Sequence, residues 1–351
     1  MPKRILFLTF SLGLGGTPKH LAEMLPALQA LGYEIELWNY GRAERYYYLL
    51  QDAGVTIKQK KRLLPDLYLH LRKHPETIVH SYLYAANALD ALLAKLAGCT
   101  YIKSTRNQGH WRTYQPMESF RLMVRNQLTD CHLVNSNLAK RYLTDGEGIH
   151  ADSVAVIPNG IEDKQNAWPS VTRAELGLNK DDYVLIAVGR LQAHKNVRFL
   201  LENWPKHPRI RLLIVGYGPQ KPELIALAKQ LGVFDCCHFL GYQEFPYAFL
   251  RISDVYVSSS KTEGMSNSLL EAMMIGLPTV AAKNGAAGVV PDETGLIYDL
   301  SNPTGYLEAV QRLIHEPELC RTLGENARKK YLAHHTLDMQ MTQYDSFYRS
   351  L

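Results

Sequence analysis

The sequence has no apolar run approaching the length of about 20 residues that a transmembrane helix requires. Cysteine is also scarce: five are scattered at positions 99, 131, 236, 237 and 320, without a C-x-x-C pair or the Cys/His spacing of a zinc site. These absences argue against a disulfide framework and against a structural zinc. We therefore expect a protein of a reducing, cytoplasmic environment.

The chain also lacks a large excess of charge of either sign. The chain carries 39 Lys and Arg against 34 Asp and Glu, a net charge of +5. This mild basic bias does not indicate nucleic acid as a partner, although it suits an anionic substrate or a membrane surface. Hydrophobic residues make up 46%, which is typical of a globular chain, and 351 residues are enough for two domains.

Strand and helix patterns alternate along the whole chain. Strands are expected at 4–10, 34–38, 77–81, 100–105, 131–135 and 154–157, and again at 183–189, 211–216, 237–241, 254–259 and 278–282. We read the opening MPKRILFLTF as a first strand rather than a signal peptide, because a glycine loop follows it directly. Alternation of this kind predicts right-handed βαβ units and parallel sheets. The polar stretch 163–182 divides the two series, and the last stretch, roughly 318–350, is expected to be helical. The sequence therefore predicts an α/β protein with two doubly wound, Rossmann-like domains that face a central cleft.

A glycine loop, Gly13 to Gly16, separates the first strand from the first helix. Thr17 and Pro18 suit the N-cap and first position of that helix. Glycines allow a ligand to approach the backbone, and a helix N-terminus attracts phosphate. The spacing does not match G-x-G-x-x-G, so a dinucleotide site is not indicated. A tight turn without a ligand is the other interpretation.

Two basic residues follow the strand at 183–189. Arg190 comes directly after it and Lys195 stands five residues later. At the carboxyl end of a strand, two fixed cations could stabilise the charge that develops on a diphosphate leaving group. Solvated loop residues are the alternative interpretation.

The next candidate segment, EGMSNSLLE, begins with the carboxylate of Glu263 and ends with that of Glu271. Such groups accept hydrogen bonds from paired sugar hydroxyls, and the intervening backbone N–H groups can meet phosphate. Ser268 and Glu271 also have the spacing of a helix capping box. No Asp-x-Asp triplet occurs anywhere, so we expect no metal and no cofactor.

Taken together, these motifs resemble glycosyltransferase family 4, the retaining enzymes of the glycosyl transferases group 1 type, which have the GT-B fold. The resemblance rests on the glycine loop, V-x-x-I-P-N-G-I at 154–161, G-R-x-x-x-x-K at 189–195, G-x-G at 216–218, F-x-G-Y at 239–242 and E-x7-E at 263–271. It implies an N-terminal acceptor-side domain at 1–163, a nucleotide-sugar donor domain at 164–333, and a C-terminal helix at 334–351 that returns to the first domain.

The resemblance also implies roles for individual residues. Arg190 and Lys195 would bind the donor diphosphate and Glu263 would face the donor sugar, and these three are the catalytic candidates. Glu271 would hold the ribose. The other implied donor contacts are Gly15, Gly16, Arg106, Gly189, Tyr242, Glu244, Gly264, Met265, Ser266, Asn267, Ser268 and Leu269. Many members have a histidine where Arg106 stands, and His80, Asn107 and His110 are alternatives for that role.

The implied function is transfer of a hexose or N-acetylhexosamine from a nucleotide sugar, with UDP expected, to a glycan. A lipid-linked acceptor in cell-surface polysaccharide or lipopolysaccharide synthesis is the hypothesis. It draws on the basic segments 58–73 and 111–125, which suit peripheral contact with the inner face of a membrane. A sugar-nucleotide 2-epimerase of the same fold and a non-catalytic nucleotide-sugar-binding subunit are the alternatives.

Overall fold

The computed structural model describes residues 3–60, 64–82, 88–106, 116–163, 170–205 and 207–351. The chain divides into two compact units, each described here by itself. Unit 1 comprises Met1–Asn159 and Leu337–Leu351, and unit 2 comprises Gly160–Thr336.

Unit 1 contains a parallel sheet of seven strands in the order β3-β2-β1-β4-β5-β6-β7. Its strands are β1 (Arg4–Thr9), β2 (Glu34–Asn39), β3 (Thr56–Gln59), β4 (Ile78–Tyr82), β5 (Thr100–Thr105), β6 (Cys131–Val134) and β7 (Val154–Val156). Ile5, Leu6, Phe7 and Leu8 of β1 are all fully buried. A strand covered on both faces needs such a continuous apolar run, which is why β1 does not alternate.

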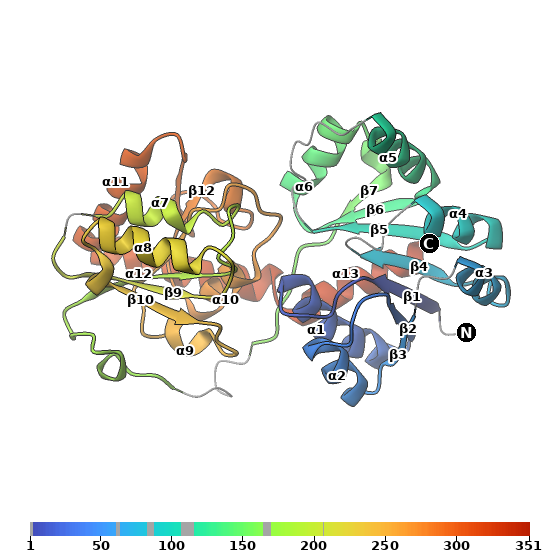
Figure 1. The fold of residues 1–351 in the computed structure, drawn as a ribbon, viewed down its shortest axis with the longest axis horizontal. Helices are drawn as coiled ribbons and strands as arrows, with labels where there is room; N and C mark the ends of the chain where they lie inside the picture. The colour runs from blue at the N-terminus through green and yellow to red at the C-terminus, as the bar shows by residue number, and fades with distance from the viewer. Residues whose placement is uncertain (1–2, 61–63, 83–87, 107–115, 164–169, 206) are drawn as a thin grey trace. The chain divides into compact units, whose positions relative to one another are not determined.

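Helices cover both faces of this sheet (Figure 1). One face packs against α1 (Gly16–Ala30), α2 (Arg45–Asp52) and α13 (Leu337–Ser350). The other packs against α3 (Leu64–Arg72) and α4 (Ala88–Ala97), with α5 (Pro116–Leu128) beside α4. A short α6 (Asn137–Arg141) precedes β7.

Unit 2 repeats the arrangement with six parallel strands in the order β10-β9-β8-β11-β12-β13. They are β8 (Tyr183–Val188), β9 (Ile210–Val215), β10 (Cys237–Gly241), β11 (Val255–Ser258), β12 (Thr279–Ala282) and β13 (Gly295–Tyr298). One face carries α7 (Val197–Glu202), α8 (Lys221–Gln230) and α11 (Pro303–His315). The other carries α9 (Tyr247–Leu250), α10 (Asn267–Ile275) and α12 (Pro317–His334). The predicted fold class of two Rossmann-like parallel-sheet domains is confirmed.

The structure differs from two local predictions. Strands β3 and β13 were not expected, because each is a four-residue edge strand, and β3 (TIKQ) is largely polar and exposed. The stretch 318–350 is helical as expected, and it consists of two helices separated by His335 and Thr336, where the chain passes from unit 2 to unit 1. Helix α1 begins at Gly16 with Gly15 as its N-cap, so Thr17 lies inside the helix and does not cap it.

Candidate functional site

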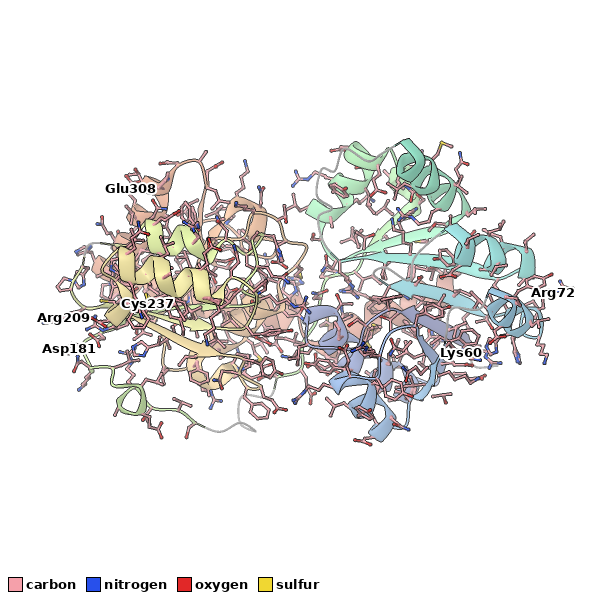
Figure 2. All side chains as sticks on the ribbon, viewed as in Figure 1. Lys60, Arg72, Asp181, Arg209, Cys237 and Glu308 are labelled. Atoms are coloured by element: carbon pink, nitrogen blue, oxygen red, sulfur yellow. The ribbon has the colours of Figure 1, made fainter. Side chains whose placement is uncertain are left out.

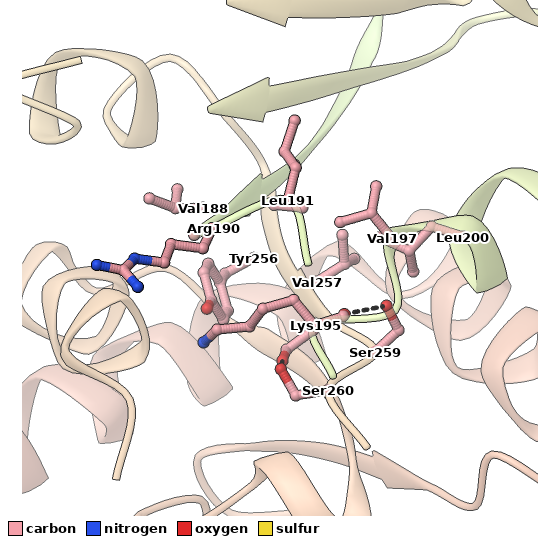
Figure 3. Close-up of a pocket in the computed structure, with 13 residues that line it drawn as sticks. Val188, Arg190, Leu191, Lys195, Val197, Leu200, Tyr256, Val257, Ser259 and Ser260 are labelled. Atoms are coloured by element: carbon pink, nitrogen blue, oxygen red, sulfur yellow. Dashed lines mark hydrogen bonds between the residues drawn. The ribbon is translucent and has the colours of Figure 1, made fainter. Parts of the chain in front are cut away.

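The residues of the G-R-x-x-x-x-K and EGMSNSLLE motifs come together in unit 2, at the carboxyl ends of β8 and β11. These strands are neighbours, and the strand order reverses between them. In doubly wound sheets such a switch point is where ligands bind. A small pocket lies here, lined by residues of the segments 187–200 and 256–260 (Figure 3).

An ion pair between Lys195 Nζ and Glu263 Oε2 joins the two motifs. Both side chains are largely buried, with exposed fractions of 18% and 14%. Burial alone would lower the pKa of Lys195, but the charge and the hydrogen bond of Glu263, together with the nearby Tyr256, outweigh burial and hold that pKa above its ordinary value. Lys195 therefore stays a cation at neutral pH. Arg190 is exposed, and its side chain reaches to the same side of the pocket as that of Lys195 (Figure 3).

Backbone contacts hold Lys195 in place. Asn196, the N-cap of α7, has left-handed backbone angles (φ 54°, ψ 37°). The Ser259 hydroxyl after β11 donates to the carbonyls of Lys195 (3.3 Å) and Asn196 (2.9 Å). The Lys261 N–H donates to the His194 carbonyl at 2.7 Å. The loop after β8 is thus fastened to the loop after β11.

The G-x-G motif at 216–218 supports the same loop by close backbone packing. A Cβ atom at Gly216 would lie 1.8 Å from the Gly189 carbonyl oxygen, and one at Gly218 would lie 2.3 Å from that of Leu191. The Leu191 N–H donates to the Tyr217 carbonyl at 2.8 Å. Both glycines are therefore required for the approach of the two loops. Sequence reasoning quoted this motif without finding its structural role.

The start of α10 is tied to the end of β8 through hydroxyl groups. Ser268 Oγ donates to the Val188 carbonyl (3.0 Å) and lies 2.9 Å from both Ser266 Oγ and the Tyr256 hydroxyl. The N-cap of α10 is Ser266, so the capping box expected from Ser268 and Glu271 is wrong. Ser268 is already inside the helix and bonds to a neighbouring strand instead.

The remaining predicted residues of this segment differ in exposure. Gly264, Met265 and Ser266 are buried, whereas Asn267 is partly exposed. Leu269 lies in the core, so only its backbone could meet a ligand. Glu271 is 3% exposed within α10. The helix ends as predicted at Gly276, which adopts the left-handed conformation (φ 80°).

Tyr242 and Glu244 follow β10, which is the edge strand of the same sheet. Both are exposed, and the Tyr242 ring meets the Tyr217 ring edge-on with centroids 5.9 Å apart. They lie at the same carboxyl edge as Gly189 and Arg190, two strands away from β8.

Arg106 is the predicted donor contact in unit 1 that has a charged side chain. It follows β5 and is buried inside this unit. Its guanidinium donates to the hydroxyls of Tyr82 (3.2 Å) and Tyr344 (2.8 Å), contacts His20 Nε2 (2.7 Å), and donates to the side chain of Asn159. This network joins α13 and the end of the V-x-x-I-P-N-G-I motif to the sheet. Sequence reasoning missed these partners.

The structure describes only one of the three residues considered as alternatives to Arg106, and it also places the two glycines of the first loop. His80 bonds to the Tyr348 hydroxyl (2.6 Å) and Ser104 Oγ (2.7 Å), and burial lowers its pKa well below the ordinary value. Asn107 and His110 lie outside the described residues. Gly15 and Gly16 stand at the start of α1.

In the described part of the chain, no group of three or more His, Cys, Asp or Glu side chains is placed to hold a metal ion. Across the same ranges, no helix combines the length and the apolar character needed to cross a bilayer.

Two protein families match the chain, one over most of unit 1 and the other over most of unit 2. Residues 14–165 match the family described as Glycosyltransferase Family 4, and residues 170–330 match Glycosyl transferases group 1. A UDP-Gal:alpha-D-GlcNAc-diphosphoundecaprenol alpha-1,3-galactosyltransferase of Escherichia coli is 26% identical over 304 residues, 78% of this chain and 75% of the relative. The lipopolysaccharide core biosynthesis glycosyltransferase LpsE of Rhizobium meliloti is 30% identical over 162 residues, 46% of this chain and 48% of the relative. For several relatives at 28–31% identity, the match spans only about half of the relative's length.

Among solved structures, that of HepE from Anabaena in complex with UDP superposes with a TM-score of 0.86 at 18% identity, covering 99% of this chain and 100% of that one. This likeness shows the GT-B fold. With the two family matches, which together span most of the sequence, it establishes that the chain belongs to the family 4 glycosyltransferases of the group 1 type.

Proposed function

We propose that the chain is a retaining glycosyltransferase that transfers a hexose or N-acetylhexosamine from a nucleotide sugar, with UDP as the nucleotide. The ion pair of Lys195 with Glu263 carries the proposal, because it places a held cation beside a carboxylate at the switch point of the unit 2 sheet. The UDP complex of HepE and the UDP-Gal donor in the name of the E. coli relative support the choice of nucleotide.

Lys195 and Arg190 bind the donor diphosphate in this proposal. Lys195 is pre-positioned by Glu263 and by the backbone contacts of its loop, so little reorganisation is needed when negative charge develops on the leaving group. Arg190 is exposed and can add a second, bidentate contact. Glu263 accepts hydrogen bonds from hydroxyls of the donor sugar next to the phosphate.

The start of α10 supplies the remaining donor contacts. Ser266, the N-cap of α10, makes no side-chain capping hydrogen bond, and the partial positive charge at this end of the helix attracts phosphate oxygens. The backbone from Met265 to Leu269 fills that role. Glu271 holds the ribose, and Tyr242 with Glu244 flanks the base.

The transfer breaks the bond between the anomeric carbon and the diphosphate oxygen, and the acceptor oxygen bonds to that carbon from the same face. The acceptor proton passes to the leaving phosphate, so no general base is assigned. Lys195 and Arg190 provide the positive charge that a metal ion would otherwise bring, and metal-independent transfer is part of the proposal.

The acceptor in this proposal is a lipid-linked glycan, in the synthesis of a cell-surface polysaccharide or lipopolysaccharide. The diphosphoundecaprenol-linked acceptor named for the E. coli relative supports the lipid linkage. The name of LpsE supports the lipopolysaccharide assignment. Both relatives are named as transferases, which favours transfer over the epimerase.

The test is incubation of the purified protein with a panel of UDP- and GDP-sugars without metal, followed by mass spectrometry of the nucleotide products. We expect slow release of the nucleoside diphosphate from one donor. Release should be lost in Lys195→Ala and reduced in Arg190→Ala, whose exposed side chain can be removed without disturbing the fold. Arg209→Ala, at an exposed position of unit 2, is the matched control and should leave release unchanged.

An isomeric sugar nucleotide without release would identify an epimerase and contradict the proposal. Donor binding without any turnover, in the presence of a lipid-linked acceptor mixture, would contradict it in favour of a binding subunit.

A further inference from the structure

Unit 1 has a pocket at the amino ends of its strands β6 and β7. The pocket lies between the C-terminal half of α5, which leads into β6, and the segment 146–153, which leads into β7. Its volume of about 470 Å³ is within the range of roughly 300–1,000 Å³ that is typical of ligand pockets. Doubly wound sheets bind their usual ligands at the carboxyl ends of the strands. This pocket is therefore at the opposite end of the sheet from the expected site of unit 1.

Apolar and polar side chains are mixed in the wall of this pocket, which we call the α5 pocket. Its apolar side chains are Leu122 and Met123 of α5 and Ile149. Met123 is 49% exposed. The exposed amide of Gln127 and the carboxylate of Glu147 line it as well. A ligand that fits must present both C–H surface and hydrogen-bonding groups.

Glu147 connects the α5 pocket to a polar cluster between α5 and the sheet. Arg125 Nη2 (3.4 Å) and Asn126 Nδ2 (3.1 Å) donate to Glu147 Oε2, and Lys103 Nζ of β5 lies 3.9 Å from the same atom. These contacts all go to Oε2. Among the described residues, no partner of Oε1 is found, and 12% of the side chain is exposed. One oxygen thus fixes the carboxylate in place, and the other can accept a hydrogen bond from a ligand.

A single π-type turn, Tyr142–Gly146, leads to Glu147. It continues α6 and has Glu147 as its C-cap. Tyr142 and Leu143 of this turn are buried in the core, so the turn is a packed part of unit 1. Turns of this kind are rare and occur frequently at functional sites.

The charges at the α5 pocket favour an uncharged ligand. Arg125 is a permanent cation, and the carboxylate of Glu147 that it contacts matches its charge. Lys103 is buried and does not line the pocket. An ion would therefore find no unmatched opposite charge in the wall. Hydroxyl groups suit the site better, because they donate to Glu147 Oε1 and exchange hydrogen bonds with the amide of Gln127.

The segments expected to meet a membrane, 58–73 and 111–125, are described only in part. Residues 61–63 and 111–115 lie outside the described residues, as do the side chains of 116–121. Lys58 pairs with Glu36, and Lys60 pairs with Asp66 (Figure 2 labels Lys60). Together with Arg125 at the α5 pocket, these cations are paired within unit 1.

We propose that the α5 pocket binds a neutral oligosaccharide, as a second glycan site that takes no part in the transfer. Sugar hydroxyls donate to Glu147 Oε1, and the C–H face of a sugar ring packs on Leu122 and Met123. The inference rests on the proposed function for its ligand class, since an enzyme that extends a glycan meets such chains as acceptor and product. A second site keeps the glycan at a high effective concentration between transfers.

The test is binding of the labelled full chain, without any nucleotide sugar, to an array of neutral and anionic oligosaccharides. Isothermal titration calorimetry with the strongest neutral binder follows. The variant Met123→Ala/Gln127→Ala should bind it about tenfold more weakly, because it loses an apolar contact and a hydrogen bond. Leu49→Ala/Gln51→Ala is the matched control, with the same residue types at exposed positions of α2, and should bind like the unaltered protein.

Glu147→Gln tests the carboxylate separately. The amide has the same shape but is a neutral acceptor, so binding should again weaken about tenfold, with circular dichroism showing a folded protein. Absence of binding to every oligosaccharide of the array, or equal affinity of the Met123→Ala/Gln127→Ala variant and its control, would overturn the proposal. Binding confined to anionic glycans would overturn it as well. Loss of binding in Lys195→Ala would assign the glycan to the donor site instead and also contradict it.

Failure of this site and failure of transfer are distinguishable. Oligosaccharide binding is measured without a donor, and release of nucleoside diphosphate is measured without an oligosaccharide. Met123→Ala/Gln127→Ala should keep that release, because neither position is in the donor site.

Discussion

Removing the carboxylate from the buried ion pair of unit 2 should destabilise that unit by an amount that the structure allows us to estimate. In Glu263→Gln, Lys195 keeps its surroundings but loses its counter-charge. Breaking one side of a buried pair costs about 3–5 kcal/mol. Because 18% and 14% of the two side chains remain exposed, we expect the lower end, about 3 kcal/mol. For a unit of this size, that corresponds to a fall in Tm of roughly 6–12 °C.

The pH dependence of this loss has a definite sign. In the unaltered protein, the raised pKa of Lys195 contributes stability that is complete below the unfolded value of 10.5 and is lost as pH rises through the folded value. In Glu263→Gln, burial acts alone and lowers the pKa, so folding at pH 7 is penalised by the buried charge. The difference in unfolding free energy between the two proteins should therefore shrink between pH 7 and 10.

The assay is thermal unfolding by circular dichroism in a double-mutant cycle with Lys195→Met. The double variant should lose about 2 kcal/mol less than the sum of the single ones. Glu325→Gln, which breaks the exposed pair of Arg321 and Glu325, is the control and should leave Tm unchanged. Additive losses, or a difference that does not shrink with pH, would refute this account of the pair.

Three further predictions concern single side chains. Arg106→Met should lower the unfolding free energy of unit 1 by about 3 kcal/mol in urea titrations, because buried polar partners lose their donor, and a loss below about 1 kcal/mol would contradict it. Gly216→Ala should cost about 2 kcal/mol or more through the clash with the Gly189 carbonyl, whereas Gly232→Ala, with open space around it, should cost only about 1 kcal/mol for its positive φ. Burial lowers the pKa of Lys103 to about 7, so its contribution to stability is complete above pH 10.5 and is lost as pH falls towards 7. Between pH 7.5 and 9 the unaltered protein should therefore gain about 2 kcal/mol over Lys103→Met, and a constant difference would count against this assignment.

Strand positions were predictable wherever a strand is covered on both faces. The apolar runs at β1 and β8 and the glycine that ends α10 follow from local composition alone. Edge strands such as β3 were missed, because their side chains face water and resemble a loop.

In the candidate site, sequence order placed Arg190 and Lys195 after one strand and Glu263 after another, and parallel topology brings such positions to one edge. The sequence alone could not show that Lys195 is paired with Glu263, because that contact depends on the geometry of two loops whose residues are 68 positions apart. The surroundings of Arg106 were out of reach for the same reason. Its partners His20 and Tyr344 stand 86 and 238 residues away, and their types suggested no common role.

The return of α13 to unit 1 has a consequence for how the chain is made. Met341, Tyr344 and Tyr348 belong to the core of unit 1, although the 177 residues of unit 2 are synthesised between them and Asn159. At roughly 5–20 residues per second, the first unit waits about 9–35 seconds on the ribosome before its last helix is made. During that interval Arg106 lacks Tyr344, and the apolar face that α13 will cover is open to water. Unit 2 thus has its whole sequence before unit 1 does, so the part of the protein that begins first is completed last.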